Sequence, residues 1–258
     1  MAWAKQVAIV TGGSRGIGRA ISRRLAAYGA AVCVNYAARA AEAEAVVSGI
    51  IAAGGRAIAV QADVADSAAV EQMIARAEAE LGPISILVNN AGVASPATLD
   101  TYDPVALARM RAVNVDGVIH TVRAVMPGMR KRGYGRIVNI ASNAAIGTGL
   151  PGTTFYAATK AEVLILTRRF AMELGRSGIT VNAVAPGWIV TEMARAGRSE
   201  EEFAARVKMV SERAMVGRPG QPDDIAAAVA FLAAPDAGFV TAQVLTVDGG
   251  RMDYIGHG

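Results

Sequence analysis

Seven short runs rich in Val, Ile and Ala recur along the chain and alternate with longer stretches whose apolar residues have helical spacing. Each run is apolar at most positions, which is typical of strands buried on both faces. Strands of this kind, joined through helices, form a parallel sheet covered by helices on either side. We therefore predict an α/β fold with a doubly wound, seven-stranded parallel sheet. The runs occupy residues 6–11, 30–36, 56–62, 85–91, 135–141, 179–185 and 243–249.

No linker rich in Pro or Ser interrupts this alternation, so we predict one domain over residues 1–258. A chain of 258 residues that are 53% hydrophobic can bury a large core. Residues 187–220 form an exception, because they contain a charged, helix-like piece and no strand. A long excursion from a compact domain is typical of a lid or a substrate loop, and a purely decorative surface helix is the alternative.

Charge and cysteine content exclude several classes of protein. The net charge is +4, but 26 basic residues are scattered among 22 acidic ones. The densest basic cluster, residues 130–132, ends a helical stretch, where cations are favoured, so we predict no nucleic-acid partner. Cys33 is the only cysteine, which excludes an intramolecular disulfide, and we predict no metal site. No run approaches 18 apolar residues, so we expect a cytoplasmic protein without a membrane segment.

The first apolar run leads directly into "TGGSRGIG", residues 11–18. Glycines at 12, 16 and 18 permit a tight turn, bring backbone N–H groups close to a pyrophosphate and let the next helix pack closely. The amino terminus of that helix favours an anion. Because ligands of doubly wound sheets bind beyond the carboxyl ends of the strands, we predict a dinucleotide phosphate site here.

Further motifs follow this loop in a fixed order. They are "NNAG" at 89–92, "VNVDG" at 113–117, "NIASNAA" at 139–145, "YAATK" at 156–160 and "APGWIVTEM" at 185–193. In these motifs and their order the chain resembles the short-chain dehydrogenase/reductase family over essentially its whole length. The resemblance implies a Rossmann-type fold and metal-free hydride transfer between a nicotinamide cofactor and a carbonyl or alcohol.

Four residues of these motifs match the family's catalytic set. Tyr156 and Lys160 are four positions apart, so a helix places them on one face. The resemblance implies that Tyr156 is the general acid and base, and that Lys160 lowers the pKa of the phenol and holds the nicotinamide ribose. It also implies that Ser142 contacts the substrate oxygen. Asn114, within the helical stretch 103–126, would support a water chain that carries protons between Lys160 and solvent.

The end of the second run indicates which cofactor is bound. NAD-preferring relatives often carry Asp at the position of Tyr36, and "VNYAARA" contains no acid. Arg15 and Arg39 can meet a 2′-phosphate, so we predict a preference for NADP(H), with NAD(H) as the alternative. The resemblance implies that Asp63 contacts the adenine amino group. The predicted cofactor-binding residues are Gly12, Ser14, Arg15, Gly16, Ile17, Gly18, Tyr36, Arg39, Asp63, Val64, Asn90, Ala91, Gly92, Tyr156, Lys160, Pro186, Gly187, Ile189 and Thr191.

The substrate is less constrained. "GITVNAVAPG" at 178–187 and the region 220–250 look most like bacterial 3-oxoacyl-(acyl-carrier-protein) reductases. That likeness implies NADPH-dependent, reversible reduction of a 3-oxoacyl thioester or a similar ketone. Met172 stands where carrier-docking relatives often have arginine, and Arg168 and Arg169 face differently on a helix. The sequence therefore leaves open whether an acyl carrier delivers the substrate.

Other functions remain as alternatives. Sugar, polyol, steroid and broad-range alcohol dehydrogenases share the same motifs. A non-catalytic nucleotide-sensing protein is a further alternative, although such proteins usually lose the tyrosine or the lysine. The family usually assembles through two long helices, here residues 103–131 and 155–177, and through the carboxyl-terminal strand. We therefore expect a homotetramer.

Overall fold

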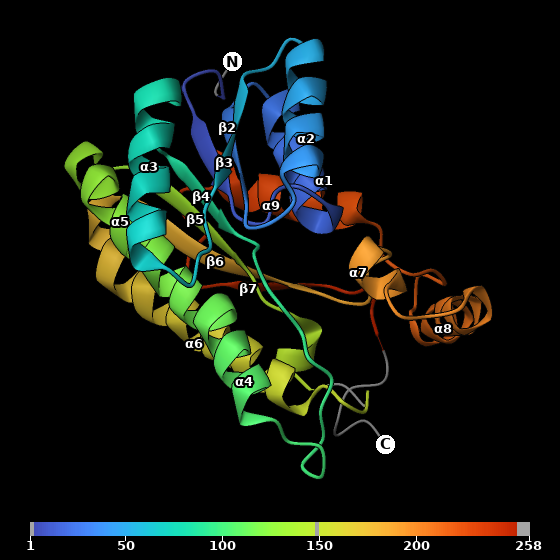
Figure 1. Ribbon diagram of the computed structural model, residues 1–258. Helices are drawn as coiled ribbons and strands as arrows, with labels where there is room; N and C mark the ends of the chain where they lie inside the picture. The colour runs from blue at the N-terminus through green and yellow to red at the C-terminus, as the bar shows by residue number, and fades with distance from the viewer. Residues whose placement is uncertain (1–2, 148–149, 252–258) are drawn as a thin grey trace.

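A computed structural model describes residues 3–147 and 150–251 of the chain. Its core is one parallel sheet with the strand order β3-β2-β1-β4-β5-β6-β7 (Figure 1). The sheet confirms the seven predicted runs, and only β6 extends past its run, by one residue. The strands are β1 (Val7–Val10), β2 (Ala31–Tyr36), β3 (Ala57–Gln61), β4 (Ile86–Asn89), β5 (Gly135–Ile140), β6 (Ile179–Pro186) and β7 (Val244–Val247).

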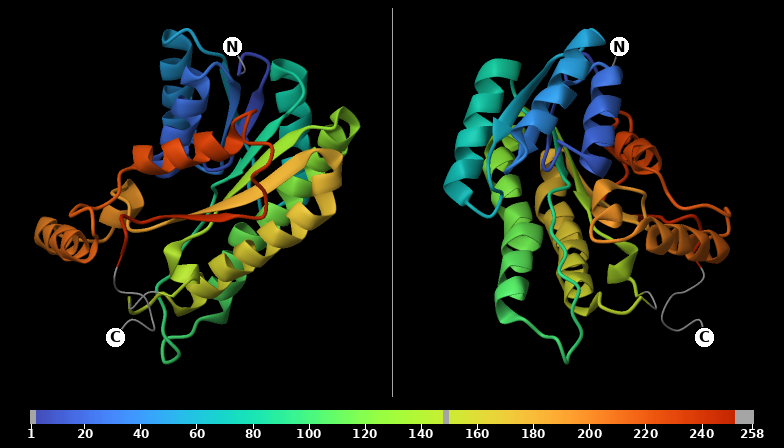
Figure 2. Two further views of the ribbon diagram at one scale, coloured as in Figure 1. Left: turned by 180° about the vertical axis from the view of Figure 1, so that it is seen from behind. Right: turned by 45° about the vertical axis from the view of Figure 1, so that its right-hand side comes forward.

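Helices cover both faces of this sheet, as Figures 1 and 2 show. On one face lie α1 (Gly16–Ala27), α2 (Ala40–Ala52) and α9 (Pro222–Ala233). On the other lie α3 (Ser67–Leu81), α5 (Gly117–Arg132) and α6 (Thr154–Leu174). Successive side chains of a strand serve opposite faces, so Ile9 packs in one core while Ala8 and Val10 pack in the other. Because both faces of the central strands are buried, most of their residues are apolar.

The strand order places the site. The chain moves outward from β1 to β3 and then returns to the other side of β1 to form β4. The carboxyl ends of β1 and β4 therefore flank the point where the order reverses, and ligands of such sheets bind there.

The helical stretch predicted over 103–126 is three consecutive helices. Asp103 caps α4 (Pro104–Arg111) as expected, since its carboxylate accepts bonds of 2.9 and 3.2 Å from the first turn. A π-helix, Ala112–Asp116, then joins α4 to α5. The basic cluster 130–132 forms the last turn of α5, where cations suit the helix dipole.

Segment 187–220 projects from the body of the molecule (Figure 2). It contains α7 (Glu192–Arg195) and α8 (Glu200–Arg213), and Ile189 pairs with Gly220 at its base. Ser199 and Glu202 form a capping box that starts α8. Two 3-10 turns, Asn143–Ala145 and Gly175–Ser177, complete the secondary structure. No helix within the described ranges 3–147 and 150–251 is long and apolar enough to cross a bilayer.

Candidate active site

The glycine loop between β1 and α1 has the geometry of a phosphate cradle. Gly12 and Gly16 have φ of 60° and 50°, a region that L side chains rarely adopt. A Cβ at Gly18 would lie 2.2 Å from the carbonyl oxygen of Gly12, so only glycine lets α1 pack this closely. The side chain of Arg15, the N-cap residue, makes no capping hydrogen bond to the amino terminus of α1. The first N–H groups of this helix are therefore available to an anion, and the predicted dinucleotide phosphates fit this loop.

The segment after β4 anchors the loop. Asn90 Nδ2 donates to the carbonyl oxygens of Thr11 (2.8 Å) and Gly12 (3.1 Å). Thr11 Oγ1 accepts from the backbone N–H groups of Asn90 and Ala91, both at 2.9 Å. Asn35, which the sequence did not single out, accepts from the N–H of Gly12 at 3.2 Å. The loop is thus held on both sides before any ligand binds.

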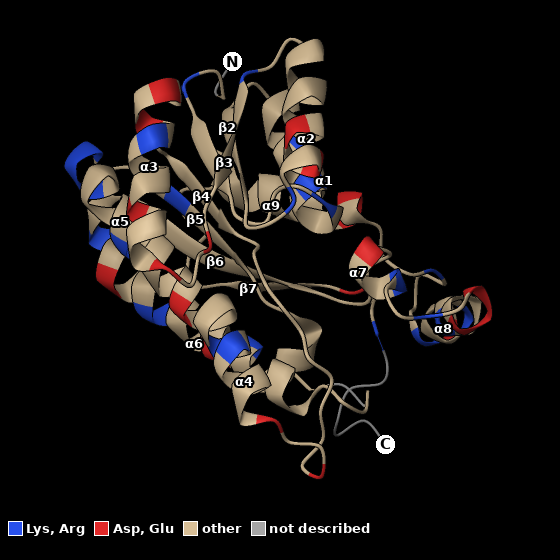
Figure 3. Cartoon of the chain, in the orientation of Figure 1, with Lys and Arg blue, Asp and Glu red and all other residues tan. Residues whose placement is uncertain are grey.

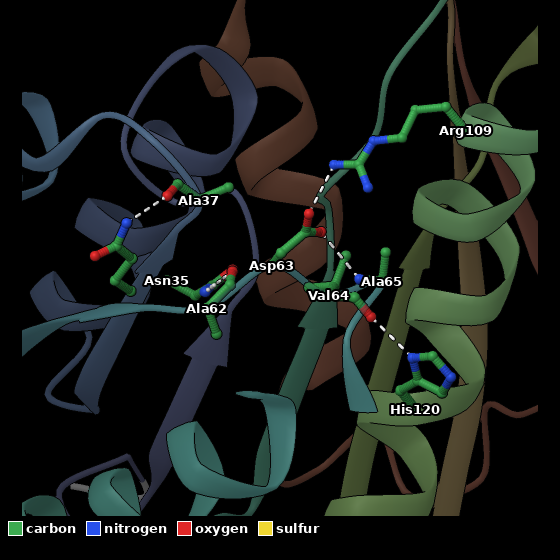
Figure 4. A network of polar contacts seen from close by, with 9 residues as sticks. Asn35, Ala37, Ala62, Asp63, Val64, Ala65, Arg109 and His120 are labelled. Atoms are coloured by element: carbon green, nitrogen blue, oxygen red, sulfur yellow. Dashed lines mark hydrogen bonds and ion pairs between the residues drawn. The ribbon is translucent and has the colours of Figure 1, made fainter. Parts of the chain in front are cut away.

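The residues predicted to bind the adenosine follow two neighbouring strands, β2 and β3, which pair in parallel. Tyr36 ends β2, and Arg39 stands at the amino terminus of α2, where its guanidinium pairs with Glu42 at 2.8 Å. Asp63 follows β3 directly. Burial opposes ionisation of Asp63, but hydrogen bonds from the N–H of Ala65 and from Arg109 hold its pKa below the usual value (Figure 4).

The predicted catalytic residues converge beyond the carboxyl end of β5. Ser142 comes two residues after β5, and its hydroxyl is near enough to the phenol of Tyr156, in the first turn of α6, to lower the pKa of that phenol. One turn later the fully enclosed Lys160 donates from Nζ to the carbonyl oxygen of Ile140 at 2.8 Å. The described fold therefore brings three of the four predicted catalytic residues to one place.

Burial shifts the pKa values of Tyr156 and Lys160. Burial raises the pKa of Tyr156, and the nearby Ser142 side chain only partly opposes this effect. Burial also lowers the pKa of Lys160 to about 8. Lys160 Nζ lies 5.9 Å from the centroid of the Tyr156 ring and its hydrogen bond goes to Ile140. Burial therefore acts against the predicted lowering of the Tyr156 pKa by Lys160, and that role of Lys160 stays a prediction.

Asn114 sits in the π-helix and is completely buried. Its Oδ1 accepts from the N–H of Val93 (2.8 Å), and its Nδ2 donates to the carbonyl oxygen of Val93 (2.9 Å) and to Thr159 Oγ1 (3.0 Å). A Cβ at Gly92 would lie 3.3 Å from Asn114 Oδ1 and 3.4 Å from Lys160 Nζ. The amide and the ammonium thus face the same small space beside Gly92. π-Helical turns are frequent at functional sites.

The predicted nicotinamide segment lies against the glycine loop. Pro186 ends β6, and a Cβ at Gly187 would lie 2.6 Å from Asp248 Cβ. The side chain of Ile189 is buried, which leaves its backbone for contacts. A Cβ at Gly16 would lie 3.3 Å from Thr191 Cγ2, so Thr191 borders the phosphate cradle. Among the described residues no group of His, Cys, Asp and Glu is arranged to hold a metal ion.

Known proteins are similar to this chain in sequence. The family model described as enoyl-(acyl carrier protein) reductase matches residues 12–251. The chain is 42% identical to a 3-oxoacyl-[acyl-carrier-protein] reductase of Synechocystis, over 96% of this chain and 98% of the relative. It is also 42% identical to an acetoacetyl-CoA reductase of Rhizobium meliloti, over 95% and 98%.

Solved structures of other proteins have a similar fold. A short-chain dehydrogenase/reductase of Serratia marcescens is 41% identical and superimposes with a TM-score of 0.89, covering 97% of this chain and 99% of that one. A short-chain dehydrogenase of Burkholderia cenocepacia in complex with NADP is 40% identical, with a TM-score of 0.86 and the same coverage. The chain therefore belongs to the short-chain dehydrogenase/reductase family.

Proposed function

We propose that this protein is an NADP(H)-dependent oxidoreductase that reduces the carbonyl group of a 3-oxoacyl thioester or a similar ketone. One observation carries the proposal. The Ser142 hydroxyl is near enough to the Tyr156 phenol to lower its pKa, and the buried Lys160 follows one turn later on α6. A carbonyl oxygen that accepts from both hydroxyls is polarised and has a proton donor in contact.

The residues of the site divide the work. NADPH, held by the glycine loop and the segment after β6, supplies the hydride when it is bound. Tyr156 keeps its proton at neutral pH because burial raises its pKa, so it acts as the acid toward the substrate oxygen. Ser142 holds that oxygen in place. Lys160, whose pKa is about 8, is mostly charged at pH 7 and stabilises the phenolate that forms. Asn114, facing the space beside Gly92, supports the return of a proton to Lys160.

The preference for NADP(H) over NAD(H) rests on the end of β2. Tyr36 supplies no carboxylate to repel a 2′-phosphate, and Arg15 and Arg39 lie on the adjoining loop and helix. The Burkholderia relative binds NADP, which supports the same choice. The kcat/KM with NADPH should exceed that with NADH at least tenfold. Arg39→Ala should reduce this ratio, and a wild-type preference for NADH would refute the assignment.

We propose that segment 187–220 is a substrate lid. A cleft of about 630 Å³ separates it from the loop after β4, with a lining that includes Pro96, Arg198, Glu202 and Met209. Ala97, next to Pro96, pairs with Thr153 at the start of α6, three residues before Tyr156. The cleft therefore adjoins the catalytic helix, where the remainder of a substrate would lie. Deleting the Met209 side chain should raise KM for long acyl substrates more than kcat falls.

Substrate assays separate the alternatives. Oxidation of NADPH is measured with acetoacetyl and crotonyl thioesters and a simple ketone, and reduction of NADP+ is measured with glucose. Rapid turnover of the acetoacetyl thioester supports the proposal. A preference for the crotonyl thioester would assign the reaction to a carbon–carbon double bond, and a preference for glucose would assign a sugar dehydrogenase. Tyr156→Phe is the control, because it keeps the ring and removes the acid. Turnover by this variant within tenfold of wild type would contradict the mechanism.

The side chains around Met172 on α6 bear on whether an acyl carrier docks to this protein. Met172 is 61% exposed, and Arg169 Nη1 lies 3.8 Å from its Sδ. Arg169 therefore reaches the exposed face of α6 on which Met172 lies, although helical spacing predicts that the two residues face different directions. We propose that an acyl carrier docks there. Arg169→Gln should raise KM for a carrier-bound substrate and leave KM for the CoA thioester unchanged, whereas equal effects on both would refute docking.

Exposed apolar side chains support a homotetramer. Val105 (76% exposed) lies on α4 and Ile165 (55%) on α6. Phe239, which precedes β7, is fully exposed. Burying such groups is favourable, and both regions are those expected to form subunit contacts. Light scattering should give four times the chain mass of 26.5 kDa. A monomeric mass at micromolar concentration would refute the assembly.

A further inference from the structure

The turn Asp63–Ala65, after β3, is held by two side chains from helices α4 and α5 (Figure 4). Asp63 Oδ2 accepts from Arg109 Nη2 at 2.8 Å, while Oδ1 accepts from the N–H of Ala65 at 3.0 Å. The carbonyl oxygen of Val64 lies 2.9 Å from His120 Nδ1. Because a carbonyl only accepts, Nδ1 of His120 carries the proton. Neither Arg109 nor His120 belongs to the family motifs in the sequence.

These contacts determine orientation more than stability. The Arg109 and Asp63 side chains are 52% and 40% exposed, and ion pairs at such positions add little to folding. They do remove rotational freedom from a carboxylate that would otherwise turn in solvent. Helix α5 approaches the same turn closely, since a Cβ at Gly117 would lie 2.6 Å from Val64 Cγ2. The turn is therefore fixed before a ligand arrives.

We propose that Arg109 and His120 are positioning residues for recognition of the adenine ring. Arg109 fixes the Asp63 carboxylate as an acceptor for the exocyclic amino group, and His120 fixes the peptide that follows Val64. The inference rests on the proposed function only in that Asp63 and Val64 contact the adenine of the cofactor. Each carboxylate oxygen that already accepts one bond retains a second lone pair for the amino group.

The hypoxanthine analogue of NADPH is the probe for this role. It shares the nicotinamide, the pyrophosphate and the 2′-phosphate with NADPH but carries a carbonyl oxygen in place of the amino group. A carboxylate held toward that position attracts the amino group and repels the carbonyl oxygen. The ratio of the two dissociation constants therefore reports how firmly Asp63 is oriented, and a general loss of folding or phosphate binding leaves it unchanged.

The experiment measures both dissociation constants by nicotinamide fluorescence. Wild type should bind NADPH at least about tenfold more tightly than the analogue, as expected for a hydrogen bond to a charged group. Arg109→Gln should reduce this ratio to about threefold or less, mainly by weakening NADPH. Arg111→Gln is the matched control, since Arg111 lies on the same helix, is equally exposed and pairs with Glu162 at 3.2 Å. It should keep the wild-type ratio.

Two further variants test how the residues act. If Arg109 acts through Asp63, Arg109→Gln should have no further effect on the ratio in an Asp63→Asn background. His120→Leu should lower the ratio, and His120→Asn should restore it because the Asn amide nitrogen takes the place of Nδ1. An Arg109→Gln variant with the wild-type ratio, or with both cofactors weakened equally, would overturn the proposal. Loss of carbonyl turnover with the ratio intact would refute the proposed reaction alone.

Discussion

Asn114→Ala tests how much the hydrogen bonds of this buried side chain stabilise the protein. The substitution removes three hydrogen bonds, two with the backbone of Val93 and one with Thr159. Each net bond contributes about 1 kcal/mol, and partial access of water to Val93 gives about 2–3 kcal/mol in total. A chain of 258 residues loses about 2–4 °C in Tm per kcal/mol, so we expect a decrease of about 4–12 °C. Differential scanning calorimetry measures it.

Thr159→Val provides the control. It removes one of the three bonds of Asn114 and the bond of 2.8 Å from Thr159 Oγ1 to the carbonyl oxygen of Tyr156, and it keeps the shape of the side chain, so Tm should fall by about two-thirds as much at most. An Asn114→Ala variant within 2 °C of wild type would show that the bonds to Val93 do not stabilise the loop after β4. Equal losses in the two variants would place the stabilising contact at Thr159 instead.

Three further predictions concern the cradle, the catalytic cation and the thiol. Gly18→Ala places a Cβ 2.2 Å from the carbonyl oxygen of Gly12, so the affinity for NADPH, measured by fluorescence titration, should fall at least tenfold. Gly175→Ala, where the new Cβ has no atom within 4 Å, should leave that affinity unchanged. Because the pKa of Lys160 is about 8, kcat/KM for reduction should be constant below that pH and fall above it, where the ammonium that stabilises the phenolate is lost. A constant kcat/KM up to pH 10 would contradict the role of Lys160. Burial raises the pKa of Cys33 to about 12, so this thiol should resist thiol reagents for hours in the native protein and react after denaturation. Rapid labelling of Cys33 in the native protein would contradict this burial.

The sheet and the helix ends could be predicted because their causes are local. A strand buried on both faces requires apolar side chains at successive positions, and that pattern is visible in residues 179–185 without any tertiary information. Asp103 followed by Pro104 likewise identifies a helix start from two residues. The glycine loop was found for the same reason, since its turn and its close packing require glycine at particular positions.

Other features depend on contacts that sequence spacing does not encode. Asp63 and Arg109 are 46 positions apart, and only the approach of α4 to the end of β3 brings them together. The π-helix at 112–116 differs from an α-helix in its hydrogen bonding, not in its composition. The reach of Arg169 along α6 depends on the side-chain rotamer rather than on the helical angle.

The pKa order of Tyr156 and Lys160 gives the clearest case in which burial acts against a sequence-based expectation. Proximity alone suggests an acid made stronger by its neighbour, but both groups are moved toward their neutral forms by desolvation. The phenol then has a pKa above its ordinary value, and the ammonium one of about 8. We therefore expect a neutral phenol and a charged ammonium at pH 7, the protonation states from which the proposed reduction starts. Oxidation of an alcohol needs the phenolate first, so we expect reduction to be the faster direction at neutral pH.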